Sequence, residues 1–235
     1  MVYAEILAGG TGSRMGNTEV PKQFMKLGSK PIIIHTIEQF VVHDKIDQII
    51  VVVPKAWINN TKDLIKKYIY QAEYIAVIEG GPTRNESLVN GIEWIEQNNG
   101  INDEDIIVTH DAVRPFLSYR IIADNITAAQ QYGAADTVIP AVDTIVMSKN
   151  NSEIFEIPIR GHMYQGQTPQ SFNIKLFKQT YLKLTETEKE ILTDAAKIMV
   201  IKDKVVKLVF GESYNIKVTT SYDLILANSI LENLL

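Results

Sequence analysis

The feature that most constrains this chain is a glycine-rich loop that directly follows an apolar segment near its beginning. Residues 3–8 are mostly apolar and predict a buried strand. Glycines follow at positions 9, 10, 12 and 16; such residues let a ligand approach the backbone and leave amide hydrogens free to face an anion. Arg14 and Lys22 add positive charge. The segment therefore indicates a seat for a triphosphate, with a turn that only reverses the chain as the alternative.

The spacing of these glycines is not that of a P-loop and fits a dinucleotide-binding fingerprint poorly. The Gly-Lys-Ser/Thr ending of a P-loop is missing. Gly10-Thr-Gly12 is followed by Ser13-Arg14-Met15, not by the third glycine of a dinucleotide-binding fingerprint. Glycine spacing alone therefore leaves a phosphate site and a structural turn both open.

The chain up to residue 141 alternates between predicted strands and helices. Apolar strands separated by such helices are typical of an α/β protein whose parallel sheet is covered on both faces. Ligands bind these sheets at the carboxyl ends of the strands, where we expect the loops 9–22, 80–87 and 109–116 to meet. After the first strand, strands are predicted at 48–53, 74–78, 105–109 and 135–141. Helices are predicted at 31–42, at 60–68, from the Thr83–Glu86 capping box onward, and at 118–132, where Gly133 ends the helix.

The alternation breaks between residues 143 and 166. Two short β-prone pieces, 144–147 and 154–159, flank a polar turn and predict a hairpin arm that leaves the main sheet. Such an arm has too little apolar area to be stable alone. We expect a second copy of the chain to cover it, and the alternative is that it folds back on its own domain. The elements predicted after the arm are helices 174–184 and 186–200, a strand at 205–209, an extended piece at 215–218 and a final helix capped by Ser221.

Composition limits the class of protein. The 235 residues carry a net charge of −5, which argues against nonspecific nucleic-acid binding, and the absence of cysteine excludes disulfides and thiolate metal sites. No apolar stretch approaches the roughly 20 residues of a transmembrane helix, and the chain begins directly with a strand, so neither a membrane span nor a signal peptide is expected. We expect a single domain over residues 1–235 and a cytoplasmic location.

Five segments, in order along nearly the whole chain, resemble one enzyme family. The first, Leu7-Ala-Gly-Gly-x-Gly-x-Arg-Met-Gly16 with Pro21-Lys22-Gln23, is similar to the signature of nucleotide-sugar pyrophosphorylases and, more narrowly, of polyol-phosphate cytidylyltransferases. The resemblance implies a three-layer Rossmann-like nucleotidyltransferase fold with a mostly parallel central sheet, CTP as substrate, and a homodimer formed through a protruding β-arm at residues 143–166. The other four segments are Gly80–Ser87, His110–Phe116, Gln167–Phe172 and Asn215–Thr219.

The same resemblance implies where CTP binds. It assigns the segment 80–87, with the start of the glycine loop, to the cytosine and ribose, and two glycines there would let a planar ring lie against the backbone. In the alternative interpretation Thr83 only caps a helix and Ser87 only belongs to its polar face, and both roles can hold together. The implied nucleotide-binding residues are Leu7, Ala8, Gly9, Gly10, Gly80, Gly81, Pro82, Thr83, Arg84, Asn85, Ser87 and Asp111.

Asp111 follows a predicted strand, and by resemblance it is the ligand of Mg²⁺. This ion takes one or two carboxylates together with phosphate oxygens and waters, so a carboxylate at a strand end beside phosphates suits it. The alternative is that Asp111 pairs with Arg114 to fix the turn. We expect His110 to be a hydrogen-bonded scaffold residue and not a catalyst.

The resemblance implies that a polyol-phosphate oxygen attacks the α-phosphorus of CTP and pyrophosphate leaves on the opposite side. The nucleophile is already an anion, so cations and alignment, not a general base, lower the barrier. Arg14 and Lys22 are expected to stabilise the charge on the α-phosphate and the pyrophosphate. Arg160 and Lys217 match family positions that hold the acceptor phosphate, and Arg160 serves the partner's site if the arm is exchanged. Weaker candidates are Thr144, Thr168 and Thr193.

Two branches of the family differ in the acceptor. One acts on D-ribitol 5-phosphate for wall teichoic acid, the other on methylerythritol 4-phosphate for isoprenoids. The segment from Gly211 to Asp223 resembles the ribitol branch, and Tyr214 stands where the other branch commonly has an aspartate near the metal. This departure weakens a second carboxylate ligand, although Glu212 is close. We therefore expect CMP transfer to D-ribitol 5-phosphate, giving CDP-ribitol and pyrophosphate, with the methylerythritol branch as the alternative.

Two other classes of function stay open at this point. A dinucleotide-dependent oxidoreductase would share the alternating strands and helices, but the glycine spacing disfavours it. A noncatalytic nucleotide-binding regulator would keep the loop for the base and would need neither Lys22 nor Arg160.

Overall fold

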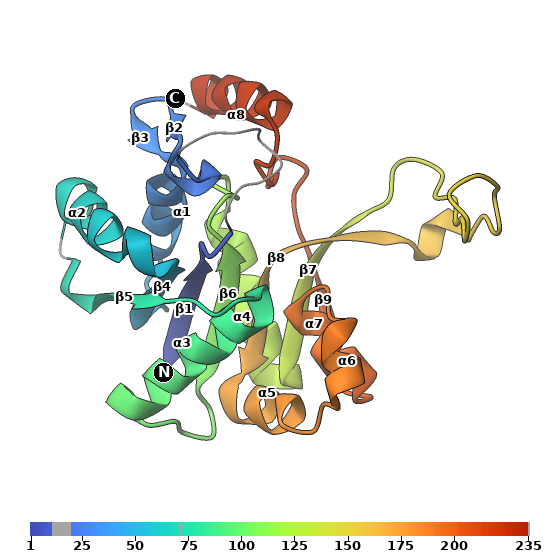
Figure 1. Cartoon of the computed structure of the whole chain (residues 1–235), viewed down its shortest axis with the longest axis horizontal. Helices are drawn as coiled ribbons and strands as arrows, with labels where there is room; N and C mark the ends of the chain where they lie inside the picture. Colours follow the sequence, from blue (N-terminus) through green and yellow to red (C-terminus); the bar gives the residue numbers. More distant parts are fainter. Residues whose placement is uncertain (11–19, 71, 235) are drawn as a thin grey trace.

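A seven-stranded mixed sheet forms the centre of the computed structural model, which describes residues 1–10, 20–70 and 72–234 (Figure 1). Its strand order is β5-β4-β1-β6-β8-β7-β9. Neighbouring strands are parallel except at β8, which runs antiparallel to both β6 and β7. The predicted α/β fold with a mostly parallel sheet is thus confirmed. The strands are β1 (Val2–Leu7), β4 (Gln48–Val53), β5 (Ile75–Glu79), β6 (Ile106–Asp111), β7 (Ala134–Pro140), β8 (Tyr164–Asn173) and β9 (Lys207–Phe210), with β2 (Lys26–Leu27) and β3 (Lys30–Pro31) as a separate hairpin.

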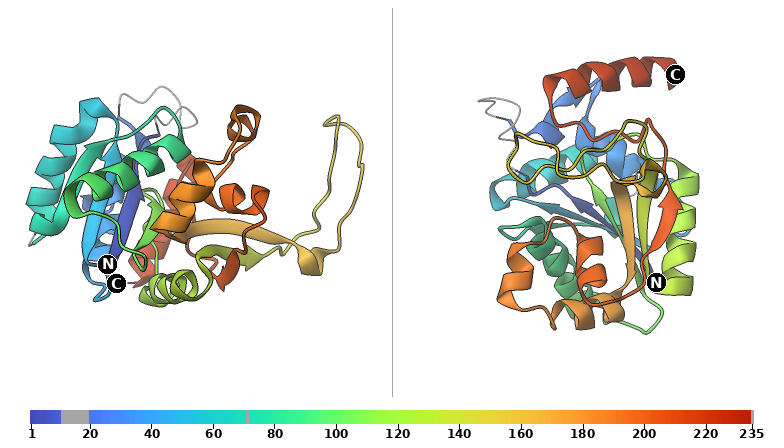
Figure 2. Two further views of the ribbon diagram at one scale, coloured as in Figure 1. Left: turned by 90° about the horizontal axis from the view of Figure 1, so that it is seen from below. Right: turned by 90° about the vertical axis from the view of Figure 1, so that its right-hand side faces the viewer.

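Helices cover both faces of this sheet, which gives the three layers seen in Figure 2. One face packs against α1 (Ile32–Val41), α2 (Ile58–Tyr68) and α4 (Tyr119–Tyr132). The other packs against α3 (Arg84–Asn99), α5 (Ile174–Tyr181) and α7 (Ala195–Ile201). Because apolar side chains lie on both faces, all six residues of β1 and of β6 are buried.

The helix ends that position the site follow local sequence signals. Thr83 and Glu86 form the predicted capping box: the Glu86 amide donates to Thr83 Oγ1 over 3.1 Å, and the Thr83 amide donates to Glu86 Oε2 over 2.9 Å. Gly133 ends α4 with a φ of 84°, a left-handed conformation that favours glycine. Among the described residues, no helix is long and apolar enough to cross a bilayer.

β8 is the main element that the sequence does not predict. Its sequence is polar and contains Pro169, which usually argues against a central strand. The polar groups find partners within the sheet: Thr109 Oγ1 donates to the carbonyl of Gln170 over 3.0 Å, and Thr137 Oγ1 donates to the carbonyl of Pro169 over 2.6 Å. A register shift against β7, between Asp136 and Val138, accommodates the proline.

The predicted arm leaves the body of the molecule between β7 and β8 (Figure 1). The expected hairpin is reduced to a single bridge between Met147 and Glu156, followed by a short 3-10 turn, η5 (Arg160–His162). Residues 164–166, which the prediction gave to the arm, belong to β8 and thus to the main sheet. The arm is therefore an extended loop. The paired chain segments from which it leaves the body, residues 139–142 and 163–165, are called its stalk.

The region after β8 corrects two predictions. The helix predicted at 186–200 is two helices, α6 (Glu186–Glu190) and α7, because Asp194 starts a new helix by accepting a hydrogen bond from the Lys197 amide over 2.9 Å. Residues 215–218, predicted as an extended piece, belong to a loop that joins no sheet among the described residues. Ser221 is the first residue of α8 (Ser221–Leu234), and Thr220 caps it by accepting from the Asp223 amide over 3.2 Å.

α8 closes the molecule above the carboxyl ends of the strands (Figure 1). Ala227 of this helix shares an apolar cluster with Leu27 of the β2–β3 hairpin, Ile32 of α1 and Val218 of the preceding loop. This cluster fixes the loop 211–220 against the strand ends, where the site lies.

Candidate active site

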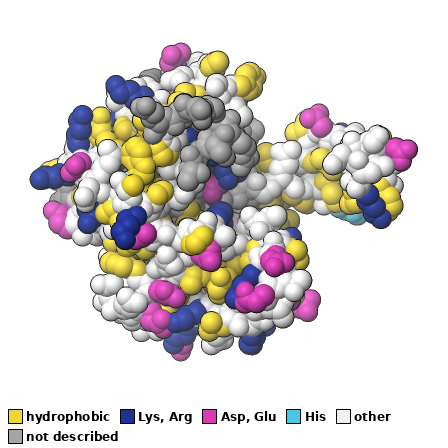
Figure 3. Space-filling model, in the orientation of Figure 1, with side chains coloured by type: hydrophobic (Ala, Val, Ile, Leu, Met, Phe, Trp, Pro, Cys, Tyr) yellow, Lys and Arg dark blue, Asp and Glu magenta, His cyan; other side chains and the backbone are white. Residues whose placement is uncertain are grey.

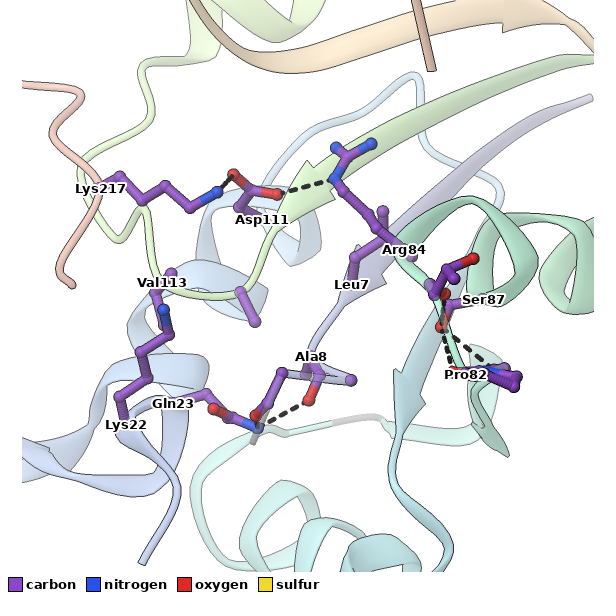
Figure 4. A pocket seen from close by; sticks show the side chains of 15 residues that line it. Leu7, Ala8, Lys22, Gln23, Pro82, Arg84, Ser87, Asp111, Val113 and Lys217 are labelled. Carbon is purple, nitrogen blue, oxygen red and sulfur yellow. Dashed lines mark hydrogen bonds and ion pairs between the residues drawn. The ribbon is translucent and has the colours of Figure 1, made fainter. Parts of the chain in front are cut away.

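A cavity of about 290 Å³ lies at the carboxyl ends of β1, β5 and β6. Its walls come from the start of the loop after β1, the 3-10 turn η2 (Lys22–Phe24), the loop between β5 and α3, the end of β6, and the loop 211–220 (Figure 4). The loops that the sequence placed at one edge of the sheet therefore meet.

Most of the residues singled out from the sequence line this cavity. Gly80, Asn85 and Arg160 do not, and Arg14 lies outside the described residues. Of the weaker candidates, Thr168 is buried below the cavity, and Thr144 and Thr193 are outside its walls. The predicted residues on the wall are Leu7, Ala8, Gly9, Gly10, Lys22, Gly81, Pro82, Thr83, Arg84, Ser87, Asp111 and Lys217; the wall also contains Gln23, Ala112 and Val113, which had no predicted role.

Gln23 fixes the described start of the glycine-rich loop. Its buried side chain donates from Nε2 to the carbonyl of Ala8 over 2.7 Å and to that of Gly10 over 3.1 Å. The next residue, Phe24, stacks on Trp57 with 4.4 Å between ring centroids. Lys22 is therefore held on the cavity wall by a turn anchored at its following residues. Gln23 belongs to the Pro21-Lys22-Gln23 motif, and that position was the signal available in the sequence.

The loop between β5 and α3 packs tightly onto the first turn of the helix. The Gly81 amide donates to Ser87 Oγ over 3.1 Å, and this hydroxyl in turn donates to the carbonyl of Thr83 over 2.9 Å. A Cβ on Gly80 would lie 2.9 Å from Ser87 Oγ, and one on Gly81 would lie 2.6 Å from the Cβ of Glu86. These glycines are needed for packing whatever binds beside them, and the Ser87 hydroxyl already has partners inside the loop.

Asp111 lies at the end of β6 and faces three cations. Its Oδ1 is 3.3 Å from Nε of Arg84, and its Oδ2 is 2.8 Å from Nζ of Lys217 and 3.5 Å from Nε of Arg114. Burial by itself would raise the pKa of this carboxyl, but the charges of Arg84, Lys217 and Arg114 outweigh it and hold the pKa far below its usual value. Figure 4 shows Lys217 and Arg84 approaching Asp111 from opposite sides. Asp111 is thus ionised throughout the physiological range.

A buried hydrogen-bond chain holds Asp111 from below. The Asp111 amide donates to Thr168 Oγ1 over 3.1 Å, and the Thr168 hydroxyl lies 3.0 Å from His110 Nδ1. His110 Nε2 lies 3.0 Å from the carbonyl of Arg114. Burial lowers the pKa of His110 to about 4, so this imidazole is neutral near pH 7, and it donates from Nε2 and accepts at Nδ1. These are the bonds of a scaffold residue.

The same chain fixes the loop 211–220. Arg114 Nη1 donates to the carbonyl of Asn215 over 2.7 Å, and Asn215 Nδ2 donates to the carbonyl of Thr168 over 2.9 Å. Asn215 is fully buried, so the loop enters the core two residues before Lys217. Asp111 therefore pairs with Arg114, as the alternative predicted, and also lines the cavity, and its role as a magnesium ligand stays a prediction.

Glu212 does not supply a second carboxylate to the cavity. Its Oε1 is 2.9 Å from Nη2 of Arg120, and it is not among the lining residues. In the described part of the chain, no three His, Asp or Glu side chains are grouped as metal ligands. The charged residues of the described walls are Lys22, Arg84, Lys217 and Asp111, a net positive set that suits a polyanion.

Comparisons with known proteins agree with this fold. The family model of 2-C-methyl-D-erythritol 4-phosphate cytidylyltransferase matches residues 2–233. The 4-diphosphocytidyl-2C-methyl-D-erythritol synthase of Anaerococcus prevotii DSM 20548 has a TM-score of 0.81 and 28% identity over 98% of this chain and 96% of that chain. The 2-C-methyl-D-erythritol 4-phosphate cytidylyltransferase of Francisella tularensis has a TM-score of 0.80 and 25% identity, covering 97% and 98%. That of Thermus thermophilus has a TM-score of 0.74 and 25% identity, also covering 97% and 98%.

Proposed function

The chain belongs to the 2-C-methyl-D-erythritol 4-phosphate cytidylyltransferase family and is a CTP-dependent polyol-phosphate cytidylyltransferase, and we propose that its acceptor is D-ribitol 5-phosphate. The products are then CDP-ribitol, a precursor of wall teichoic acid, and pyrophosphate. The alternative acceptor is 2-C-methyl-D-erythritol 4-phosphate, the compound in the names of the similar proteins.

The observation that carries this proposal is the loop 211–220. Lys217 reaches the cavity from it, whereas Glu212 pairs with Arg120 outside the cavity walls. Tyr214 hydrogen-bonds the same Glu212 side chain and stands where the methylerythritol branch commonly has an aspartate. Asp111 is therefore the one carboxylate on the described walls, a departure from that branch which supports the ribitol assignment.

We assign CTP to the cavity with its triphosphate against the cationic side. Gly10, where a Cβ would meet no atom of the described residues within 4 Å, is proposed to leave space beside the backbone for the phosphates. Arg84 and Lys217 already bracket one carboxylate and can extend their charge to phosphate oxygens. The cytosine and ribose are assigned to the side formed by Gly81, Pro82 and Thr83. Arg14, outside the described residues, keeps its proposed place beside the triphosphate.

Asp111 is the proposed contact for Mg²⁺. The donor set fits this ion, since one carboxylate can be completed by phosphate oxygens and waters. Lys217, with its side chain 40% exposed, and Arg84, with 24%, have room to turn from the carboxylate toward phosphate oxygens. Held by Asp111, Mg²⁺ would neutralise phosphate charge and help to orient the triphosphate.

In the proposed reaction, the chain contributes position and charge. A phosphate oxygen of the acceptor forms a bond to the α-phosphorus as the bond to pyrophosphate breaks on the opposite side, and no proton has to be removed. Lys22 and Arg14 stabilise the negative charge that develops on the α-phosphate and the leaving pyrophosphate. Lys217 holds the phosphate of the acceptor in line, together with Arg160 of a partner subunit.

We further propose a homodimer formed through the arm at residues 143–166. Arg160 is exposed on the arm, donates to the carbonyl of Val142 over 3.1 Å, and does not reach the cavity of its own subunit. Figure 3 displays hydrophobic side chains over the arm, and such a surface usually marks an interface. The residues of the arm and its stalk that are at least half exposed are Val142, Val146, Ile154, Phe155, Ile157 and Ile159. Residues 1–235 are proposed to form one domain that includes the arm, and the cytoplasmic location stays a prediction.

A panel of acceptors tests the proposed function. Purified protein is given CTP and Mg²⁺ with either D-ribitol 5-phosphate or 2-C-methyl-D-erythritol 4-phosphate, and pyrophosphate release is followed. We expect kcat/KM for ribitol 5-phosphate to be higher by at least about a hundredfold, because an acceptor site built on hydroxyl contacts rejects analogues strongly. A preference for methylerythritol phosphate would refute the ribitol assignment and leave the cytidylyltransferase activity in place.

A further inference from the structure

A buried carboxyl group on β1 has no role in the reaction described so far. Glu5 occupies the middle of a strand whose six residues are all buried, and its side chain is 0% exposed. Neither carboxyl oxygen has a hydrogen-bond partner in the described part of the molecule. Burying an unpartnered carboxyl group opposes folding, so packing does not account for a glutamate at this position.

The helix above Glu5 leaves room for its carboxyl group. Gly91 lies on the inner face of α3, and a Cβ there would be 2.0 Å from Oε1 and 2.7 Å from Cδ of Glu5. Glycine weakens a helix interior compared with alanine. The chain thus combines two locally unfavourable residues, a buried acid and a mid-helix glycine, that fit each other in space.

Arg84 is a cation on the same helix as Gly91. It lies seven residues before Gly91, two turns away on the same face of α3. Its Nε contacts Asp111, while its Nη1 is buried and has no hydrogen-bond partner among the described residues. Burial raises the pKa of Glu5 well above its usual value, and the charge of Arg84 opposes that rise.

The sheet register places Glu5 and Asp111 on the same face below Arg84. Glu5 on β1 pairs with Thr109 on β6, and Asp111 is two residues further along that strand. Side chains two residues apart in a strand lie on one face, about 6.6 Å apart along it. Arg84 therefore has one carboxyl group toward the cavity and one toward the core. The other charged groups that interact electrostatically with Arg84 or Asp111 are Asp136, Arg114 and Lys217.

We propose that Glu5 is a positioning residue for Arg84. Asp111 is shared by three cations, and substrate phosphates with their metal ion compete for it. When they engage Asp111, Nη1 of Arg84 turns to the carboxyl group of Glu5, which keeps the guanidinium on the cavity wall beside the triphosphate. The inference rests on the use of CTP by this chain and is independent of which polyol phosphate accepts CMP.

Two substitutions at position 5 separate positioning from packing. Glu5→Met fills the space without a polar group, so it should raise the Tm by about 2–4 °C and lower kcat/KM for CTP by about tenfold or more. Glu5→Gln keeps an oxygen that can accept from Nη1 of Arg84, and its kcat/KM should stay within about threefold of the wild type. A gain in stability with a loss of activity is not expected of a purely structural residue. The matched control is Thr109→Val on the same face, which loses a hydrogen bond and should lower the Tm with kcat/KM within about twofold of wild type.

A double-mutant cycle with Arg84→Gln decides whether Glu5 acts through Arg84. The loss caused by Glu5→Met should shrink to about twofold or less in the Arg84→Gln background. An equal loss in both backgrounds, or Glu5→Met with kcat/KM within about twofold of wild type, overturns the proposal. Should Glu5→Met not fold, Gly91→Ala takes its place in the same cycle, because it displaces the carboxyl group without removing it from the chain.

The readout keeps this proposal distinct from the ribitol assignment. Each variant is also titrated with CTP alone by calorimetry, and turnover is measured with whichever acceptor the wild type uses. If the wild type is inactive with ribitol 5-phosphate, the ribitol assignment fails, but the CTP titrations of the Glu5 variants still test the role of Glu5. If Glu5→Met changes neither the affinity for CTP nor turnover, the role of Glu5 fails and the ribitol assignment is unaffected.

Discussion

Asp111 keeps its charge because three cations surround a carboxylate that burial alone would make a weaker acid. Its folded pKa lies below the usual 3.8, so its contribution to stability is present above that value and is lost only as the pH falls toward the folded pKa. Arg84, Arg114 and Lys217 in turn depend on it, since removal of one charge from a buried cluster leaves the others uncompensated. Asp111 thus contributes both to the stability of the strand ends and to the charge of the cavity.

Lys22 is expected to act on the transition state more than on substrate binding. Lys22→Ala should lower kcat by about 10²–10³, because a fixed donor at developing charge is removed. Pyrophosphate release at saturating CTP and acceptor measures the loss, and an unchanged Tm shows that the fold is intact. Lys26→Ala, an exposed lysine nearby, is the matched control. Near-normal turnover in Lys22→Ala would remove Lys22 from the mechanism.

Asp136 on β7 gives a pH dependence of stability. Burial raises its pKa to about 7, and the charge of Asp194 adds to this, while the hydrogen bond from Gln170 opposes it. Between about pH 4 and pH 7 the folded state therefore holds a proton that the unfolded chain has lost, and stability falls as the pH rises through this window. An asparagine at this position keeps the acceptor for Gln170 and has no charge to bury.

Thermal unfolding of Asp136→Asn at several pH values tests this. We expect its Tm to match that of the wild type near pH 4 and to exceed it by about 3–6 °C at pH 8, after allowance for partial exposure. Asp63→Asn, on the exposed face of α2, should follow the wild type at every pH. A constant difference between Asp136→Asn and wild type across the range would contradict the raised pKa.

The sequence predicts the residues of the cavity better than it predicts their partners. Lys22, Asp111 and Lys217 stand in motifs and line one cavity, as expected. The roles of Gln23 and Glu5 depend on what lies opposite them in space, namely two backbone carbonyls and a glycine of α3. Such complementarity between distant segments leaves no periodicity or spacing in the sequence.

Among the elements, the arm is the one that a partner is proposed to cover. Ile157→Asp should weaken the dimer by about tenfold or more, since it places a charge on an apolar surface that a second copy covers. Sedimentation velocity over a range of concentrations measures the change. Val42→Asp substitutes a similarly exposed residue outside the arm and should leave the association unaltered. A wild type that sediments as a monomer at micromolar concentration would rule out the proposed dimer.

The strands with apolar sequences are predicted well and β8 is not, for one physical reason. Burial of β4 and β6 is driven by their side chains, so it is visible as an apolar run. Burial of β8 depends on hydrogen bonds from Thr109, Thr137 and Asn215 to its carbonyl groups, and those donors come from three other segments. The break between α6 and α7 has a local cause, the Asp194 cap, within a stretch that otherwise reads as a helix.

For the whole molecule, the proposed exchange of arms predicts that two inactive variants restore each other. In a mixed dimer of Lys22→Ala and Arg160→Ala, one site lacks both side chains and the other has both. Random pairing makes half of the dimers mixed, so activity should return to about one quarter of that of the wild type. Turnover is measured after the two proteins are mixed and allowed to exchange subunits, with each variant alone as the control. Activity no higher than the sum of the two variants would mean that each subunit uses its own Arg160.

β8 runs without interruption from the stalk of the arm, at Tyr164, to the core, and Thr168 under the amide of Asp111 is part of it. Because this strand is continuous, although its register against β7 shifts between Asp136 and Val138, a change at the arm can be carried along it to the core. Tilting the arm would then shift the hydroxyl that accepts a hydrogen bond from the Asp111 amide. In the proposed dimer, changes in subunit pairing would therefore be expected to alter the proposed reaction centre, and a drug or mutation that bends the stalk would reach that centre without touching it.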